Sequence, residues 1–262
     1  MAELVVYRSA WRRGPLALLA VLGILGLCSS SYAAGDPVVR ELSDAVRQGA
    51  GKPGEISSAI RILILLTALS LIPTLLIATT SFLRVIIVLS MLRHAIGMQD
   101  TPPNAALISI ALFLTLFSMM PVWSQVDEKA WQPFQQNRLS PEAALREGYQ
   151  PIREFMVRQT REPDLALMVE LSKGQQPETI EDVSAVQLIP AFMLSELRTA
   201  FQIGFMIFLP FLLIDIIIAS VLTSLGMMMV PPVMISLPLK VLMFILIDGW
   251  NLVVRSLMGS FY

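Results

Sequence analysis

The chain has 262 residues, of which 55 % are hydrophobic and 15 % charged, and its mean hydropathy is +0.68. Soluble domains carry about a quarter charged residues, so this composition indicates a membrane protein. The 19 basic and 20 acidic residues nearly cancel, which argues against a nucleic-acid binder. A single histidine (His94) and a single cysteine (Cys28) exclude a multi-histidine or thiolate metal site, and we expect neither cofactor nor metal.

The first 33 residues have the layout of a secretory signal peptide. Arginines precede an apolar run over residues 16–27, which is too short to span a bilayer comfortably. Small residues follow this run, and they predict cleavage between Ala33 and Ala34. Residues 34–61 are then an N-terminal segment outside the cytoplasm. An uncleaved first anchor is the alternative interpretation.

Four long apolar stretches follow, and each is long enough for a helix across about 30 Å of hydrocarbon. They cover residues 62–80, 105–123, 199–225 and 230–254. Prolines interrupt the connections within each pair, at Pro102–Pro103 and at Pro231–Pro232. We therefore predict an all-α membrane-associated fold with four long apolar helices in two hairpins, residues 62–123 and 190–262.

A polar insert, residues 124–189, separates the two hairpins and is expected to form short amphipathic helices on the periplasmic side. Ser140-Pro141-Glu142 is a typical helix start. The apolar residues that follow share one helical face, which predicts packing against a neighbour: Leu145, Tyr149, Ile152, Phe155 and Met156.

The signal peptide also predicts the orientation of the hairpins. With the amino terminus outside, residues 81–104 are a cytoplasmic connection, and the first helix has the sequence to continue into it. Arg84 and Arg93 then agree with the positive-inside rule.

No nucleophile, phosphate loop or zinc-protease motif is recognisable, so we expect no enzyme. The unusual polar residues are Glu196, Asp215, Lys240 and Asp248, in or beside the last two apolar stretches. An ionisable side chain at mid-bilayer costs about 2.5–3.5 kcal/mol unless it is paired or hydrated. Folding the hairpin at its turn brings Asp215 within about 6 Å of Lys240 along the axis, so a pair within one chain is feasible.

Glu196 and Lys240 lie roughly 34 Å apart along the same axis, so a pair between them requires two chains. The alternative interpretation is one satisfied pair within the chain and charges at the membrane interface.

Met227-Met228-Met229 lie between Gly226 and the double proline. In a turn, their unbranched thioether side chains could project together, and copies from several subunits could form a deformable constriction. The alternative is that these methionines only fill space.

Two sequence motifs resemble the signatures of the FliP family, whose members are core proteins of the flagellar type III export gate. Residues 190–205, PAFMLSELRTAFQIGF, resemble the first signature. The second motif resembles the second signature. It begins with Pro238-Leu239-Lys240, continues with the apolar run 241–247 and ends with Asp248-Gly249-Trp250. The methionine-containing segment and the sequence around Arg84 also look like family sequence.

The resemblance implies a non-enzymatic subunit in the bacterial inner membrane and flagellar basal body. Such subunits assemble in several copies, as a pentamer, with FliQ and FliR around a channel for unfolded flagellar proteins. FlhB, FlhA and membrane lipid are further expected partners. Met227, Met228 and Met229 take the family's gasket role, and Glu196 and Lys240 match its buried charged positions.

In the family, the hydrophobic helices pack into a raised assembly, so Lys240 and Asp248 are expected between subunits. Together, Glu196, Asp215, Lys240 and Asp248 are our candidates for assembly or gating. The signal peptide and Arg84 favour the flagellar branch over the related virulence-secretion branch. An alternative function is an ion- or proton-coupled transporter that uses Asp215, Lys240 and Asp248 as a relay.

Overall fold

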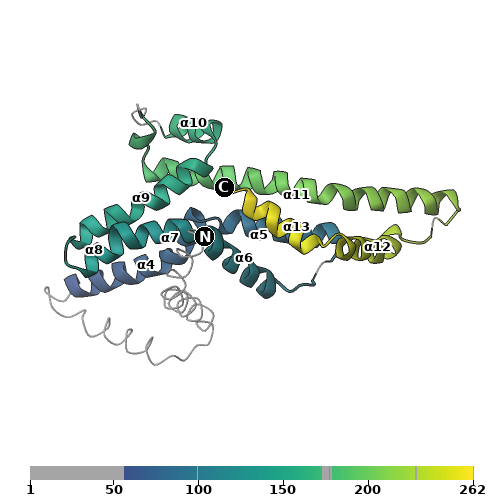
Figure 1. Cartoon of the computed structure of the whole chain (residues 1–262), viewed down its shortest axis with the longest axis horizontal. Helices are drawn as coiled ribbons and strands as arrows, with labels where there is room; N and C mark the ends of the chain where they lie inside the picture. The colour runs from purple at the N-terminus through teal and green to yellow at the C-terminus, as the bar shows by residue number, and fades with distance from the viewer. Residues whose placement is uncertain (1–55, 99, 173–176, 178, 228, 262) are drawn as a thin grey trace, which may run out of the picture. The chain divides into compact units, whose positions relative to one another are not determined.

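The computed structural model describes residues 56–98, 100–172, 177, 179–227 and 229–261, which are helical without a strand (Figure 1). The predicted signal peptide, its cleavage site at Ala33 and Ala34, and nearly all of residues 34–61 lie outside these ranges. The chain divides into two units between Ile72 and Pro73. In the first unit, the described residues belong to the start of helix α4 (Ile56–Thr79), where Leu63, Leu66 and Leu69 are exposed.

The second unit contains the rest of α4 and the other described helices. Their bounds are α5 (Phe82–Ile96), α6 (Asn104–Ser118), α7 (Met120–Val126), the π-helical turn η2 (Asp127–Trp131), α8 (Gln132–Gln135), α9 (Pro141–Gln159), α10 (Glu162–Leu171), the 3₁₀ turn η3 (Ile180–Asp182), α11 (Ala185–Ser224), α12 (Pro232–Leu246) and α13 (Gly249–Gly259).

The expectation of four long continuous helices is wrong for the second and fourth apolar stretches. The second stretch bends by 56° after Ser118, and the fourth is divided into α12 and α13, which meet at 66°. The first stretch lies in α4, whose end, Leu69–Thr79, meets α5 at 69°. Among the described helices, only α11, with 40 residues, is long and apolar enough by itself to cross a membrane. If each bent pair of helices is counted as one span, the number of candidate spans rises to four. The sequence therefore predicts the apolar stretches correctly but not their breaks.

The three breaks lie at defined residues. The first helix does not continue into residues 81–104: α4 ends at Thr79, and a new helix, α5, begins at Phe82. The second break lies at Met119, and the buried hydroxyls of Ser81 and Ser118 are 2.6 Å apart, so the two breaks are joined. At the third, Asp248 adopts φ +52°, a left-handed conformation that no α-helix can continue.

The predicted helix of the insert forms as the sequence indicates. The hydroxyl of Ser140 accepts a hydrogen bond from the backbone N–H of Ala143, which caps the start of α9. Along the predicted face of α9, Phe155 and Met156 are buried, whereas Leu145 at the other end of the stripe is exposed. Helices α9 and α10 both contact α11.

Helix α11 begins before the predicted boundary between the insert and the second hairpin. Ser184 and Gln187 form a capping box that starts the helix at Ala185, so the boundary at residues 189 and 190 falls inside it. Pro190 and Pro210 both lie inside the helix, where each removes one backbone hydrogen bond. The insert is thus attached to the same helix that carries the third apolar stretch.

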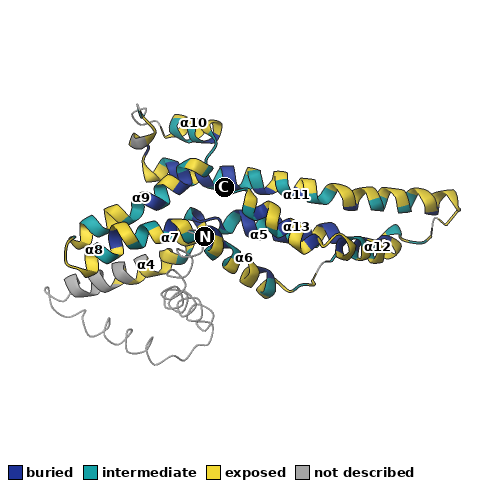
Figure 2. Cartoon of the chain, viewed as in Figure 1, coloured by how far each residue is buried: buried dark blue, intermediate teal, exposed yellow. Residues whose placement is uncertain are grey.

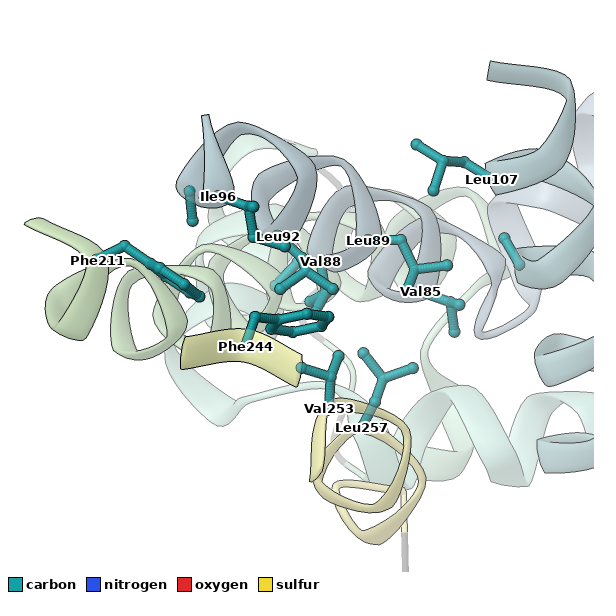
Figure 3. Packing of buried hydrophobic residues seen from close by; sticks show 13 residues of the cluster. Val85, Val88, Leu89, Leu92, Ile96, Leu107, Phe211, Phe244, Val253 and Leu257 are labelled. Atoms are coloured by element: carbon teal, nitrogen blue, oxygen red, sulfur yellow. The ribbon is translucent and has the colours of Figure 1, made fainter. Parts of the chain in front are cut away.

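Two clusters of buried hydrophobic residues hold the second unit together. The larger one joins α5, α6, α11, α12 and α13, and Figure 3 shows Phe244, Val253 and Leu257 facing the valines and leucines of α5. The smaller one joins α7, α9 and the first turns of α11. Phe261 packs against both clusters. Beyond them, the half of α11 nearer to α12 is largely exposed (Figure 2).

Candidate functional site

The methionines lie in the turn between α11 and α12. Gly226 has φ +75°, a conformation that glycine adopts without strain, and the backbone N–H of Met227 returns to the carbonyl of Leu222. The side chain of Met227 is 44 % exposed and that of Met229 is 96 % exposed, whereas Met228 lies outside the described residues. Within one chain, the two described methionines are therefore presented outward rather than packed.

The predicted pair between Asp215 and Lys240 is formed in the structure. The Nζ of Lys240 donates to Oδ2 of Asp215 at 2.6 Å and to the carbonyl oxygen of Ala95 at 3.4 Å. Ala95 lies in the last turn of α5, where the helix dipole favours a cation. This lysine therefore ties α12 to both α11 and α5.

Glu196 has a partner that sequence reasoning missed. Both of its carboxylate oxygens accept hydrogen bonds from Arg84 of α5, from Nε at 2.8 Å and from Nη2. The side chains of Arg84 and Glu196 are 2 % and 0 % exposed. Arg84 thus lies buried in helix α5 and not in an open connection, while the cytoplasmic side expected for residues 81–104 stays a prediction. Glu196 and Lys240 each have a partner in their own chain, so a pair between chains is not needed to satisfy either of them.

The remaining donors of Arg84 reach two other segments. Its Nη2 also donates to Oε1 of Gln159, and its Nη1 donates to the carbonyl and hydroxyl oxygens of Ser260, all at 2.9 Å. The guanidinium carbon lies 4.1 Å from the ring centre of Phe261, a cation–π contact. We call this set the Arg84 network: Arg84, Gln159, Glu196, Ser260 and Phe261.

A second polar network beside Glu196 was also absent from the predictions. Asp164 of α10 is buried, and its Oδ2 accepts from the hydroxyl of Ser195 at 2.8 Å. Its Oδ1 lies 3.1 Å from Nη2 of Arg198, and the backbone N–H of Arg161 donates to the same serine. These bonds fix the start of α10 against α11. The signal in the sequence was the spacing of Ser195 and Arg198, one helical turn apart on either side of Glu196.

The match with known proteins covers the methionine turn and both ion pairs. The model of the FliP family matches residues 65–257. The chain belongs to the FliP family. Relatives named "Flagellar biosynthetic protein FliP" include that of Bacillus subtilis (50 % identical over 209 residues, 80 % of this chain and 95 % of the relative) and that of Pectobacterium carotovorum (52 % over 204 residues, 78 % and 79 %). The relative from Caulobacter vibrioides is 48 % identical over 197 residues, 75 % of this chain and 74 % of the relative.

These matches confirm the resemblance that the two motifs indicate. Its flagellar family and its membrane-compatible helices are consistent with a membrane-associated component of the flagellar export apparatus. The matched range includes Arg84, Glu196, Asp215 and Lys240, whereas Ser260 and Phe261 lie just beyond it. Within the described ranges, no group of three or more His, Cys, Asp or Glu side chains is placed to hold a metal ion.

The last candidate, Asp248, is exposed within this chain. It stands at the bend between α12 and α13, and the next two residues of the FliP motif shape that bend. A Cβ atom on Gly249 would overlap the ring of Phe244, and Trp250 packs edge-on against the same ring with centroids 5.6 Å apart. Burial of Asp248 between subunits thus stays a prediction.

Proposed function

We propose that the chain is a core subunit of the flagellar type III protein export gate in the bacterial inner membrane. In this proposal several copies, five in a complete gate, assemble with FliQ and FliR around a channel through which unfolded flagellar proteins pass. Membership of the FliP family supports the flagellar assignment. The chain acts by forming the wall and closure of a channel, and it carries out no chemical reaction on its substrates.

The exposed apolar surface supports association with lipid or with other copies. Large side chains on α11, among them Phe201, Phe205, Leu213 and Ile216, are each more than half exposed. The candidate span of α11 has only 11 % of its residues buried within the chain. Apolar surface of this extent is unfavourable in water and indicates contact with a membrane or with a partner protein.

The observation that carries the gate proposal is the turn that presents Met227 and Met229 outward at the end of α11. When copies surround a channel, Met227, Met228 and Met229 form a ring of flexible thioethers that excludes water and ions yet adapts to an unfolded chain. Lys240 holds α12 to α11 below this turn. Glu196, Asp215, Lys240 and Asp248 serve assembly or gating in this proposal.

The gate is tested by replacing Met227, Met228 and Met229 with alanine and measuring ion leakage across the inner membrane of secreting cells. We expect leakage well above that of the wild type, because alanine leaves the constriction wide enough for water. Met206→Ala, which truncates an exposed methionine of α11 outside the turn, is the matched control. Leakage equal to that of the wild type in an assembled triple variant contradicts the gasket role.

A second candidate function rests on the Asp215–Lys240 ion pair. A proton- or ion-coupled transporter that uses these residues with Asp248 requires transport by the isolated protein. Reconstitution in liposomes, with flux of protons and small cations as the readout, separates the two functions. Flux that Asp215→Asn abolishes supports the transporter, and the absence of flux with the purified protein removes it.

A further inference from the structure

Helix α11 ends in a backbone motif that sets the direction in which the methionine turn leaves it. The N–H of Gly226 returns to the carbonyl of Thr223 at 3.1 Å, and the N–H of Met227 returns to the carbonyl of Leu222 at 3.0 Å. These two bonds satisfy carbonyls that the last helical turn leaves free, and they need a residue with a positive φ directly after the helix end. Gly226 provides it with φ +75°. The backbone of this glycine therefore places the first methionine.

Space within the chain is not the reason for a glycine at position 226. A Cβ atom added there would meet no atom within 4 Å beyond its own neighbours in the chain. The opposite holds at Gly249, where an added Cβ would overlap the ring of Phe244. An L-amino acid with a side chain adopts a left-handed backbone about tenfold less readily than glycine does. Within one chain, the backbone conformation alone thus calls for glycine at position 226.

The other end of the methionine turn is constrained by prolines. Helix α12 begins with Pro232, and Pro231 before it has φ −63°. A residue that precedes a proline is restricted to extended conformations, which limits Val230. The N–H of Val230 also bonds to the carbonyl of Met227 at 3.3 Å. The turn is therefore held at both ends, by two prolines on the side of α12 and by a single glycine on the side of α11.

We propose that Gly226 is the positioning residue of the methionine gasket, and that its left-handed backbone aims Met227, Met228 and Met229 at the channel. This inference rests on the proposed gate and adds the residue that directs its closure. The thioether side chains adapt to an unfolded chain through their own rotatable bonds, while the backbone that carries them stays in place. Because several copies close the channel together, a turn that points elsewhere leaves a gap even when every methionine is present.

The test compares Gly226→Ala with Gly226→Asn in assembled gates, and ion leakage across the inner membrane of secreting cells is the measurement. Alanine is the smaller of the two side chains but disfavours a positive φ, whereas asparagine is larger and tolerates it. We expect leakage severalfold above that of the wild type in Gly226→Ala and close to the wild type in Gly226→Asn. Side-chain size alone predicts the reverse order.

The matched control is Gly259→Ala. Gly259 is the last residue of α13, and a Cβ atom added to it would also meet nothing within 4 Å. It differs from Gly226 in lying within a helix and not at a positive φ. We therefore expect leakage equal to that of the wild type. The yield of assembled complex is measured for each variant, so that leakage is compared only between gates that assemble.

Two results overturn the positioning role of Gly226. One is a Gly226→Ala gate that leaks no more than the wild type, and the gate function then stands as long as the methionine variant leaks. The other is a Gly226→Asn gate that leaks as much as Gly226→Ala or more, because glycine is then needed for room between copies. Failure of the gate proposal is a different result: the assembled methionine variant does not leak ions.

If Gly226→Ala does not assemble by itself, gates that mix variant and wild-type chains take its place. A single misdirected turn is expected to open a gap, so mixed gates that leak above the wild type support the positioning role. Mixed gates that contain the variant chain and stay as tight as the wild type contradict it.

Discussion

Of the ion pairs that join α11 to other helices, Arg84–Glu196 and Lys240–Asp215 differ in how completely they are satisfied. The Arg84–Glu196 pair is buried, and each of the five N–H groups of the guanidinium has an acceptor. In the Lys240–Asp215 pair, the aspartate side chain is 34 % exposed and one of its oxygens lacks a partner among the described residues. Water can reach part of the Asp215 side chain, whereas Lys240 and both members of the first pair are buried. Loss of the cation is therefore expected to cost more at the first pair than at the second.

Removing Arg84 is expected to cause the largest loss of stability. Arg84→Met leaves the carboxylate of Glu196 buried without its cation, which costs about 3–5 kcal/mol. We expect a large drop in the yield of assembled complex and in its thermal unfolding temperature in detergent. Arg84→Met with Glu196→Met is the control, because two apolar side chains leave no buried charge. A double variant as unstable as the single one contradicts this explanation.

Removing Lys240 is expected to cost less, about 1–3 kcal/mol. The carboxylate left behind by Lys240→Met is partly exposed, so it regains hydration that Glu196 cannot. The same thermal unfolding measurement is the test, with Lys240→Met and Asp215→Asn combined as the control. A loss equal to that of Arg84→Met removes the distinction between the two pairs.

Of the three changes, Ser260→Ala is expected to cause the smallest loss of stability. It removes one of the two acceptors that Nη1 of Arg84 has on this residue, while the carbonyl acceptor stays. We expect a loss of about 0.5–1.5 kcal/mol in thermal unfolding. If Ser260→Ala instead matches Arg84→Met, the hydroxyl rather than the Glu196 carboxylate is the main partner of the guanidinium.

Short-range patterns in the sequence predict much of this molecule. The apolar stretches, the start of α9 at Ser140 and the all-helical class follow from composition and helix-end chemistry. The Asp215–Lys240 pair follows from counting residues on both sides of a turn, because helix geometry converts the count into a distance. Each of these inferences needs only residues that are close in sequence or related by one turn.

The Arg84 network could not be predicted in this way. Arg84 and Glu196 are 112 positions apart, and Ser260 is 176 positions from Arg84, with several bends between them. No local pattern distinguishes an arginine that ends a membrane segment from one that is buried against a distant carboxylate. The break at Asp248 did have a local signal, because Asp-Gly is a turn-forming pair, but the length of the apolar stretch around it favours one continuous helix.

Helix α11 is too long to be a simple membrane anchor. Its 40 residues extend over about 60 Å, whereas the hydrocarbon layer is only about 30 Å thick. The part that supports α9 and α10 carries Glu196 and Arg198, whereas the part after Thr199 has Asp215 as its single charged residue and is the one suited to lipid. If that part crosses the bilayer, residues 185–198 continue the helix by roughly another 20 Å and form a rigid support for α9 and α10 outside the hydrocarbon layer.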